Sequence, residues 1–271
     1  MSRPATPEAL PAGAQPRWER RKEARPSELL AAALELFVDK GYANTRLDDV
    51  AARAGVSKGT LYLYFANKED LFKAVVRESV VPLIAQAATE AHGYEGSSAD
   101  LLRGLITSWW NDYGRSPAGG ISKLIMAESG NFPEIASFFL EEVIEPWHRL
   151  IGGAIQRGID RGEFRRVDVP TFVQMLTAPM VMLSVWSRSF GPCSSKQVDP
   201  DQYIELLADT TLRGLRNDAT AKAATAAAAA KAAKAAKAAK GSGAMNRANG
   251  GAKRAAGASP VARLSRKKRP S

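Results

Sequence analysis

Leu47-Asp-Asp-Val-Ala-Ala-Arg-Ala-Gly-Val-Ser-Lys-Gly-Thr-Leu-Tyr-Leu-Tyr-Phe65 is the stretch of sequence that decides the fold. Its small and apolar residues have the spacing of two short helices that pack closely across a tight turn. Gly55 permits a positive φ at that turn, and the hydroxyl of Ser57 is suited to cap the second helix. The stretch therefore predicts a helix-turn-helix, a motif whose second helix enters the major groove of DNA.

The second helix of this motif has two different faces. Leu61 and Phe65 share one face on a helical wheel, and we assign Phe65 to the core with Leu61. The opposite face, which would enter a major groove, carries Lys58, Gly59, Thr60, Tyr62 and Leu63. Lysine donates to guanine acceptors, threonine offers a hydroxyl and a methyl group, and glycine permits close backbone approach. The alternative is that the tyrosines are core aromatics without a DNA contact.

Helix signals flank the motif on both sides. Ser27 is a plausible N-cap of a first helix that follows a flexible start, and Gly41 is its plausible C-cap. A hydroxyl or amide side chain followed three positions later by an acid predicts two further helix starts, at Thr45 and Asn67. The motif is thus expected to be one part of a small helical domain.

The sequence beyond Lys68 predicts helices almost without interruption. They are expected near residues 68–91, 98–113, 119–129, 133–161, 168–189 and 200–216. Pro146 and Pro179 fall inside two of them, and an interior proline removes a backbone hydrogen bond, so we expect bends there. Strand signals are absent, which predicts an all-α fold.

Four segments are expected along the chain. They are a flexible basic arm at 1–25, a helix-turn-helix DNA-binding domain at 26–73, a helical effector-binding and dimerisation domain at 74–217, and a disordered tail rich in Ala and Lys at 218–271. The arm and the tail are expected to lack a fold because neither has the apolar pattern of a core.

The positive charge of the chain is concentrated in the tail. Of the 38 Lys and Arg residues 13 follow Asp218, where no acid occurs, which leaves 25 bases and 28 acids before that point. A polycation binds any DNA by counterion release and reads no bases. The tail resembles linker-histone tails in its Lys-Ala repeats, and the alternative is a solvated extension without a role.

Composition excludes several other classes of protein. Cys193 is the single cysteine, which fits a reducing cytoplasm, and no Cys/His group has the spacing of a zinc site. The first 26 residues lack the apolar core of a signal peptide, and the apolar run 177–186 is shorter than the ~18 residues of a membrane span. Without a nucleophile–base pair or a phosphate loop, neither an enzyme nor a cofactor is expected.

The run from Gly41 to Leu71 resembles the DNA-binding domain of the TetR/AcrR family. The resemblance rests on the spacing Ala-Gly-Val-Ser-Lys-Gly-Thr-Leu-Tyr-x-Tyr-Phe-x-x-Lys-x-x-Leu, which fixes many positions at once. It implies base contacts from Lys58, Gly59, Thr60 and Tyr62. It implies phosphate contacts from Thr45, Arg46, Ser57, Tyr64 and Lys68. Arg46 departs from the family pattern, which has a second hydroxyl beside the first.

The resemblance also implies a homodimer and a small-molecule effector. Each monomer of such a protein reads one half-site, so two recognition helices must be spaced for successive major grooves. The pairing surface is expected on helices 168–189 and 200–216, with apolar contacts from Leu176, Met180, Leu183, Trp186, Tyr203, Leu206, Leu207 and Leu212. The alternative is that these residues pack inside one subunit.

An effector pocket is expected among the central helices. Aromatic and methionine side chains there could line an adaptable apolar cavity. The candidates are Trp109, Tyr113, Met126, Phe138, Trp147, His148, Met175 and Met182. For each of them, ordinary core packing is the alternative.

Together these features predict a transcriptional regulator. The leading hypothesis is a cytoplasmic homodimeric repressor that binds a palindromic operator in double-stranded DNA and is released by a small apolar or amphipathic effector. The alternative is an architectural, nucleoid-type protein in which the basic tail dominates DNA binding. No membrane partner is expected.

Overall fold

The computed structural model describes the backbone of residues 17–217 and the side chains from Pro26 onward. Helices make up this part of the chain, with one isolated bridge between Phe164 and Arg216. The expected all-α fold is confirmed. Residues 1–16 of the predicted arm and the whole predicted tail lie outside the described residues.

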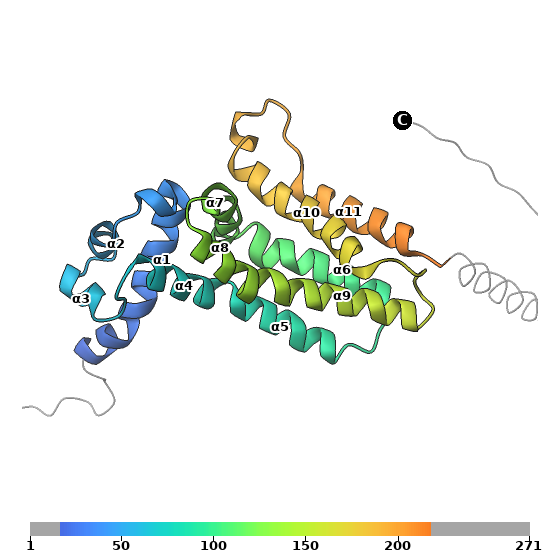
Figure 1. The fold of residues 1–271 in the computed structure, drawn as a ribbon, viewed down its shortest axis with the longest axis horizontal. Coiled ribbons are helices and arrows are strands. Elements are labelled where there is room, and N and C mark those ends of the chain that lie inside the picture. Colours follow the sequence, from blue (N-terminus) through green and yellow to red (C-terminus); the bar gives the residue numbers. More distant parts are fainter. Residues whose placement is uncertain (1–16, 218–271) are drawn as a thin grey trace, which may run out of the picture. The chain divides into compact units, whose positions relative to one another are not determined.

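Four helices form the region of the helix-turn-helix (Figure 1). They are α1 (Arg17–Asn44), α2 (Leu47–Arg53), α3 (Lys58–Tyr62) and α4 (Lys68–Ser79). Leu61 and Phe65 are buried as predicted, in a core that also contains Phe37 and Phe72. The rings of Phe37 and Phe72 meet edge to face with centroids 5.5 Å apart, a favourable aromatic geometry.

The predicted caps of these helices are partly confirmed. The side chains of Ser57 and Asn67 accept the backbone N–H groups of the residues three positions on. Gly41 ends the regular part of α1 with a φ of 81°. The predicted start at Ser27 was wrong, because α1 begins at Arg17. The helix runs through Pro26, which costs it one backbone hydrogen bond. Thr45 is not the cap of α2; that position is Arg46.

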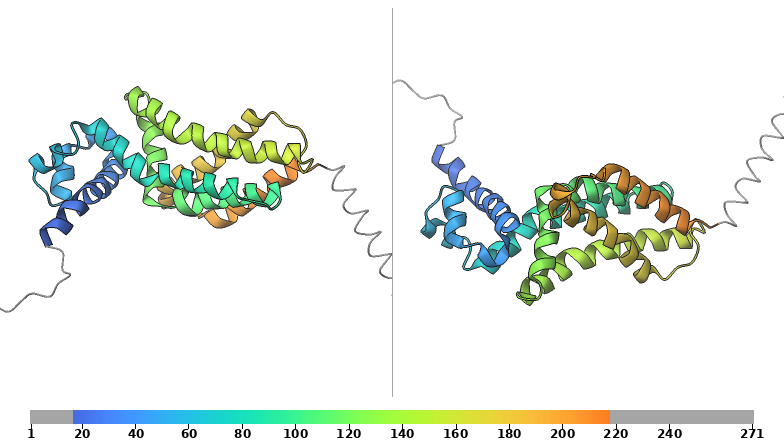
Figure 2. Two further views of the ribbon diagram at one scale, coloured as in Figure 1. Left: turned by 90° about the horizontal axis from the view of Figure 1, so that it is seen from below. Right: turned by 90° about the horizontal axis from the view of Figure 1, so that it is seen from above.

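The remaining elements build the helical body (Figures 1 and 2). They are α5 (Val81–His92), α6 (Ser98–Ser108), η1 (Trp109–Gly114), η2 (Pro117–Gly119), α7 (Gly120–Glu128), α8 (Pro133–Phe139), η3 (Leu140–Ile144), α9 (Glu145–Asp160), α10 (Val169–Arg188), η4 (Gly191–Cys193) and α11 (Pro200–Leu215). α9 packs on α5, α6 and α10, while α11 lies against α6. Apolar faces from all of these helices meet in one core.

Three of the predicted helices are interrupted. The helix expected at 68–91 is α4 and α5, because Pro82 starts a new helix after Val80. The π-helical segments η1 and η3 interrupt the helices expected at 98–113 and 133–161. Pro146 is the second residue of α9, just after η3, and lacks the N–H that a regular turn needs, so the expected distortion of the helix is present there. α10, in contrast, continues through Pro179.

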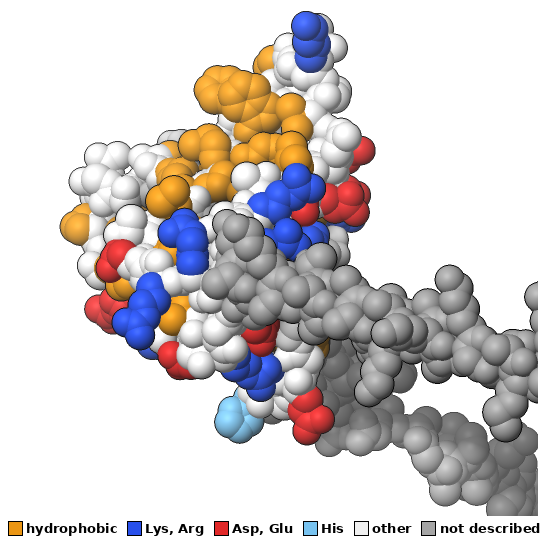
Figure 3. Space-filling view, turned by 90° about the vertical axis from the view of Figure 1, so that its right-hand side faces the viewer, with side chains coloured by type: hydrophobic (Ala, Val, Ile, Leu, Met, Phe, Trp, Pro, Cys, Tyr) orange, Lys and Arg blue, Asp and Glu red, His pale blue; other side chains and the backbone are white. Residues whose placement is uncertain are grey.

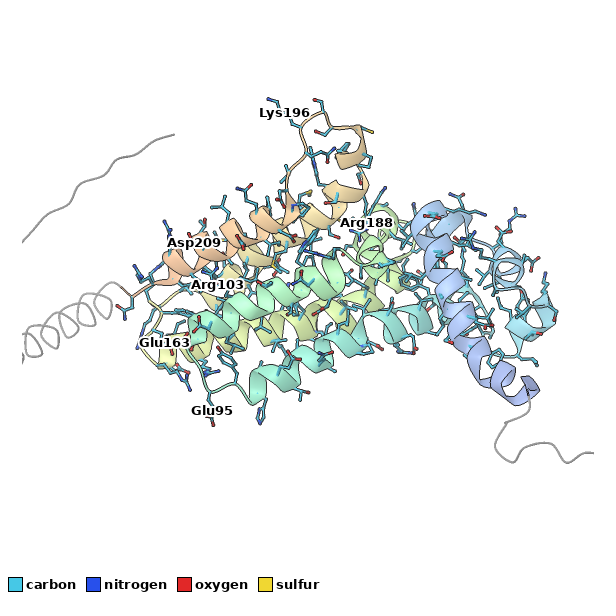
Figure 4. All side chains as sticks on the ribbon, turned by 180° about the vertical axis from the view of Figure 1, so that it is seen from behind. Glu95, Arg103, Glu163, Arg188, Lys196 and Asp209 are labelled. Atoms are coloured by element: carbon cyan, nitrogen blue, oxygen red, sulfur yellow. The ribbon has the colours of Figure 1, made fainter. Side chains whose placement is uncertain are left out.

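α10 is apolar over a longer stretch than the run 177–186 noted in the sequence. By length and composition alone it is sufficient to cross a membrane. It packs on α7 and α9, however, and buries Leu176, Met180 and Leu183. Its last residue, Arg188, is half-buried and donates to the carbonyl oxygens of Gly114 and Ser116 (Figure 4). These contacts are those of a core helix in a helical body.

Helices α1–α4 and the helical body are joined by direct packing. α1 lies against α7, and Gly120 at the start of α7 touches Val38, so closely that an added Cβ would come within 2.5 Å of Val38 Cγ1. α4 lies against α8, and Arg77 donates to both carboxylate oxygens of Glu142. Two contacts therefore join the helical body to helices α1 and α4.

Gly120→Ala is expected to destabilise the protein by about 1–3 kcal/mol, because the new methyl group overpacks the junction of α1 and α7. The matched control is Gly104→Ala, since Gly104 lies inside α6 with open space where its Cβ would be. Alanine there is expected to be neutral or to stabilise by up to about 1 kcal/mol. Thermal unfolding of both variants measures the difference; equal melting temperatures would contradict the close packing at Gly120.

Candidate DNA-binding surface and ligand cavity

Helix α3 presents one face to solvent. Ser57 Oγ accepts the N–H of Thr60 at 3.1 Å and lies 2.8 Å from its hydroxyl, which fixes the start of the helix. Leu61 anchors the opposite side in the core. Lys58, Gly59 and Tyr62 are exposed as a result, and Thr60 is half-buried between them and the core. The four predicted base-reading residues thus share the outer side of one short helix.

Lys58 has an acidic partner in the free protein. Its Nζ lies 2.8 Å from a carboxylate oxygen of Asp48 at the start of α2. That hydrogen bond raises the pKa of the Lys58 ammonium, so the side chain stays charged. The ammonium also lies 5.8 Å from the ring centre of Tyr62. Lys58 and Asp48 are both highly exposed. The Lys58 ammonium can therefore exchange Asp48 for an acceptor on a DNA base or phosphate at little energetic cost.

Leu63 was left out of the predicted contact residues although it belongs to the same surface. It directly follows α3, and its side chain is 82% exposed. The helical wheel placed Leu63 on the groove-facing side of this helix, but the resemblance did not assign it a base contact, and an exposed leucine alone does not indicate one. On a surface that meets a major groove, its side chain can contact a thymine methyl group.

The prediction for Thr45 needs correction. Its side chain is only 2% exposed, and the hydroxyl donates to the carbonyl oxygens of Leu36 and Gly41. A hydroxyl has one proton, and a phosphate oxygen is only an acceptor, so this group has no donor left for DNA. Thr45 therefore holds the end of α1. Arg46, Ser57 and Tyr64 from the same predicted set are exposed.

Lys68 also has contacts within the protein. Its ammonium donates to the carbonyl oxygens of Tyr42 at 2.7 Å and Ala43 at 3.1 Å, and it lies 4.5 Å from the ring centre of Tyr42. Partial burial lowers its pKa. One of the three ammonium protons remains for a phosphate. The main contribution of Lys68 is to tie the start of α4 to the segment after α1.

The body contains an apolar cavity of about 480 Å³. This volume is within the usual range of ligand sites. Six of the eight predicted effector residues line it, namely Trp109, Tyr113, Met126, Trp147, His148 and Met182. The other two were wrong. Phe138 packs beneath Arg77 at the contact with α4, and Met175 is 67% exposed on the outer side of α10.

Helix α5 and segment η3 provide much of the lining that the sequence did not identify. These apolar residues are Val80, which directly precedes α5, and Leu83, Ile84, Ala87, Leu140, Val143 and Ile144. Small and aliphatic residues at helical spacing look alike whether they face a cavity or a solid core. The π-helical turns at η1 and η3 both border the cavity, and only the structure shows that they do.

A few polar groups interrupt this apolar lining. The hydroxyls of Tyr113 and Ser122 lie 2.7 Å apart in the interior, where burial raises the pKa of Tyr113 to about 12. Burial lowers the pKa of His148, so its imidazole is neutral at neutral pH. Trp147 Nε1 is buried and has no hydrogen-bond partner in the described part of the chain. Glu90 and Asp112 contribute exposed carboxylates to the lining.

A second apolar surface lies on α10 and α11. Figure 3 shows hydrophobic side chains gathered near the loop between these helices, at the top of the view. The exposed large side chains here are Met175, Met182, Trp186, Phe190 and Leu206. Leu176, Met180 and Leu183 were predicted to pair with a partner, but they are buried inside this subunit. Tyr203, Leu207 and Leu212 are half-buried.

The exposed α3 on a helix-turn-helix, attached to a helical body, defines the class of helix-turn-helix DNA-binding proteins. Family models agree with this class. Residues 29–75 match the family of bacterial regulatory proteins called tetR, and residues 95–199 match a tetracyclin repressor-like C-terminal domain.

Individual relatives are transcriptional regulators. The chain is 43% identical over 200 residues to the HTH-type transcriptional activator FasR of Mycolicibacterium smegmatis, which covers 73% of this chain and 86% of that protein. It is 27% identical to the fatty acid metabolism regulator protein of Bacillus subtilis over 57% of this chain and 80% of that protein. The chain belongs to the TetR family; it is a DNA-binding transcriptional regulator and not an enzyme.

Solved structures share the fold. The transcriptional regulator FadR of Bacillus subtilis, in complex with stearoyl-CoA, superposes with a TM-score of 0.58 at 19% identity, over 70% of this chain and 99% of that chain. A transcriptional regulator from Saccharomonospora viridis, in complex with choline, gives a TM-score of 0.61 at 22% identity, over 72% and 99% of the two chains.

Proposed function

We propose that this protein is a cytoplasmic, homodimeric repressor that binds a palindromic operator through α3 and leaves it when an amphipathic effector with a long acyl chain enters the body. The observation that carries the proposal is the apolar cavity of about 480 Å³. Its lining includes Met126 of α7, and α7 is the helix that packs on α1. A ligand in the cavity therefore acts on the element that positions the DNA-binding region.

The DNA-contacting part of the proposal uses the exposed side of α3. Lys58, Gly59, Thr60 and Tyr62 read base edges, with Leu63 beside them. Phosphates are contacted by Arg46, Ser57 and Tyr64, and by the remaining proton of Lys68. A single short helix covers one half-site, so specific recognition needs a second copy at about 34–36 Å.

The exposed apolar surface on α10 and α11 supports a dimer. Leu206 on α11 is 64% exposed. Met175, Met182 and Trp186 add exposed apolar side chains on α10. Large apolar side chains concentrated on neighbouring helices favour a protein partner. A second copy of the same surface buries them and leaves each DNA-binding region free.

Two observations support an effector with an acyl chain: the lining of the cavity and the names of the relatives. Carbon atoms dominate the cavity wall, which suits an extended hydrocarbon. FadR of Bacillus subtilis was solved with stearoyl-CoA, and the relative from the same species found by sequence is named a fatty acid metabolism regulator protein. FasR is named an activator, whereas the protein is proposed here to be a repressor. Release from DNA is the proposed event in either case.

The double variant Lys58→Ala, Tyr62→Ala is expected to lose at least about 30-fold in operator affinity, because two base contacts of about 1–3 kcal/mol disappear. A gel shift with the DNA flanking the gene measures this loss. Lys196→Ala, which removes an exposed charge in the loop before α11, is the control and should bind normally. Deleting residues 219–271 should preserve specific binding; loss of all binding would favour the architectural alternative.

Leu206→Glu is expected to convert the dimer into a monomer, because it would place a charge in the apolar interface. Sedimentation velocity gives the mass directly, and operator affinity should fall in parallel. Ala88→Glu adds the same charge to an exposed position on α5 and should remain dimeric. A Leu206→Glu protein that sediments as a dimer contradicts this surface as the interface.

Ala87→Phe is expected to fill part of the cavity and to block the effector response. Ala87 is buried and lines the cavity, whereas Ala88 on the same helix is exposed and does not. Stearoyl-CoA should release wild type and Ala88→Phe from operator DNA, and leave Ala87→Phe bound. Fluorescence anisotropy of labelled operator follows the release. Equal release of all three proteins would show that the effector does not use this cavity.

A further inference from the structure

The cationic side chains of residues 26–79 are almost all engaged within the protein. This segment carries 8 acids and 7 bases, so it lacks the excess of positive charge that is usual in a DNA-binding domain. Lys68 donates to two carbonyl oxygens. Five further cations form the ion pairs Lys40–Asp49, Arg53–Glu35, Lys58–Asp48, Lys73–Glu69 and Arg77–Glu142. Within residues 26–79, little free positive charge therefore remains for DNA.

The pair of Lys58 and Asp48 differs from the other four because it includes a residue of α3. Lys58 Nζ lies 2.8 and 2.9 Å from the two carboxylate oxygens of Asp48. The other pairs join α1 to α2, lie within α4, or join α4 to η3. Lys58 and Asp48 are both exposed, so their pair contributes little to stability. Its importance lies in its place, because it occupies the cation at the start of the recognition helix.

A carboxylate at this place acts differently on operator DNA and on other DNA. Phosphates occur along any duplex, whereas the guanine acceptors that suit a lysine occur only at particular sequences. On non-operator DNA, the Asp48 carboxylate is an acceptor already in position. A lysine that left it for a phosphate would leave an unpaired negative charge beside the DNA backbone. On the operator, base acceptors replace Asp48 while the rest of α3 fits the groove.

We infer that Asp48 determines specificity: it holds Lys58 back from the phosphates of non-operator DNA and releases it to the base acceptors of the operator. The inference rests on the proposed function, in which Lys58 reads bases. Asp48 makes no DNA contact of its own and acts through Lys58, so it is a positioning residue. It lowers the affinity for random DNA and leaves the reading of the operator to α3.

The experiment replaces Asp48 by its neutral isostere and measures binding to two probes. Full-length wild type first selects a duplex from a random-sequence pool, and a scrambled duplex of the same composition is the second probe. Fluorescence anisotropy over a range of salt concentrations gives the affinity and the log–log salt slope for each probe. Asp48→Asn should steepen the slope on the scrambled duplex by about 0.9, the value of one phosphate contact, and leave the slope on the selected duplex unchanged. The preference for the selected duplex should fall roughly 3- to 10-fold at low salt.

Asp49→Asn is the matched control. Asp49 is the next residue of α2 and pairs with Lys40 of α1, so its loss changes the net charge equally without freeing a residue of α3. It should change the affinity for both duplexes by the same factor and leave the preference unchanged. In a Lys58→Ala background, Asp48→Asn should have the same effect as Asp49→Asn. The basic segments at 1–25 and after Asp218 are identical in every variant, so comparisons between variants cancel their contribution.

The outcomes separate the inference from the proposed function. If Asp48→Asn changes the slope equally on both duplexes, or changes neither, the role of Asp48 is overturned and the proposed function stands. The same holds if the preference still falls in the Lys58→Ala background. A loss of affinity for the selected duplex with an unchanged slope on the scrambled one would make Asp48 a direct base contact, which also overturns the inference. If wild type enriches no sequence from the pool, the proposed function fails and this inference fails with it.

Discussion

The end of α1 is the point on which the rest of the structure depends. Gly41 turns the chain with a positive φ, and the groups that the turn frees are each satisfied by a different element. Thr45 before α2 donates to the Gly41 carbonyl, and Lys68 at the start of α4 donates to the next two carbonyls. Glu128 at the end of α7 accepts the N–H of Ala43 at 3.1 Å. The recognition helix and the body are therefore oriented against one short segment.

On the proposed function, this junction links the cavity in the body to the DNA-binding surface. α7 contributes Met126 to the cavity and Glu128 to the junction, two residues apart on one short helix. A ligand that shifts α7 changes the contact with α1 directly, without a long chain of intermediates. The pair of Arg77 and Glu142 adds a second link, because η3 borders the cavity and α4 follows the recognition helix. Helices packed at such contacts move as units.

Sequence predicts those features that arise from local chemistry. The caps at Ser57 and Asn67 and the turn at Gly41 depend on neighbouring residues, and the structure has them. The faces of the long helices depend on packing partners far along the chain. Met180 and Met175 illustrate the difference: both are methionines on α10, yet one is buried and the other exposed. The sequence therefore predicts which types of residue line the cavity better than it predicts which individual residues do.

Charge and recognition belong to different parts of this regulator. Residues up to Asp218 carry 28 acids and 25 bases, so this part gains no overall attraction to DNA. Its cation on α3, Lys58, is paired with Asp48 in the free protein, and Thr45 and Lys68 use donors to hold the fold. On the proposed function, affinity from these residues comes from the fit of α3 to base edges and from doubling that fit in a dimer. The 13 positive charges after Asp218 are predicted to add attraction that is independent of sequence and that salt would weaken. Substitutions on α3 would then alter sequence specificity, and substitutions after Asp218 would alter general affinity for DNA, each without affecting the other.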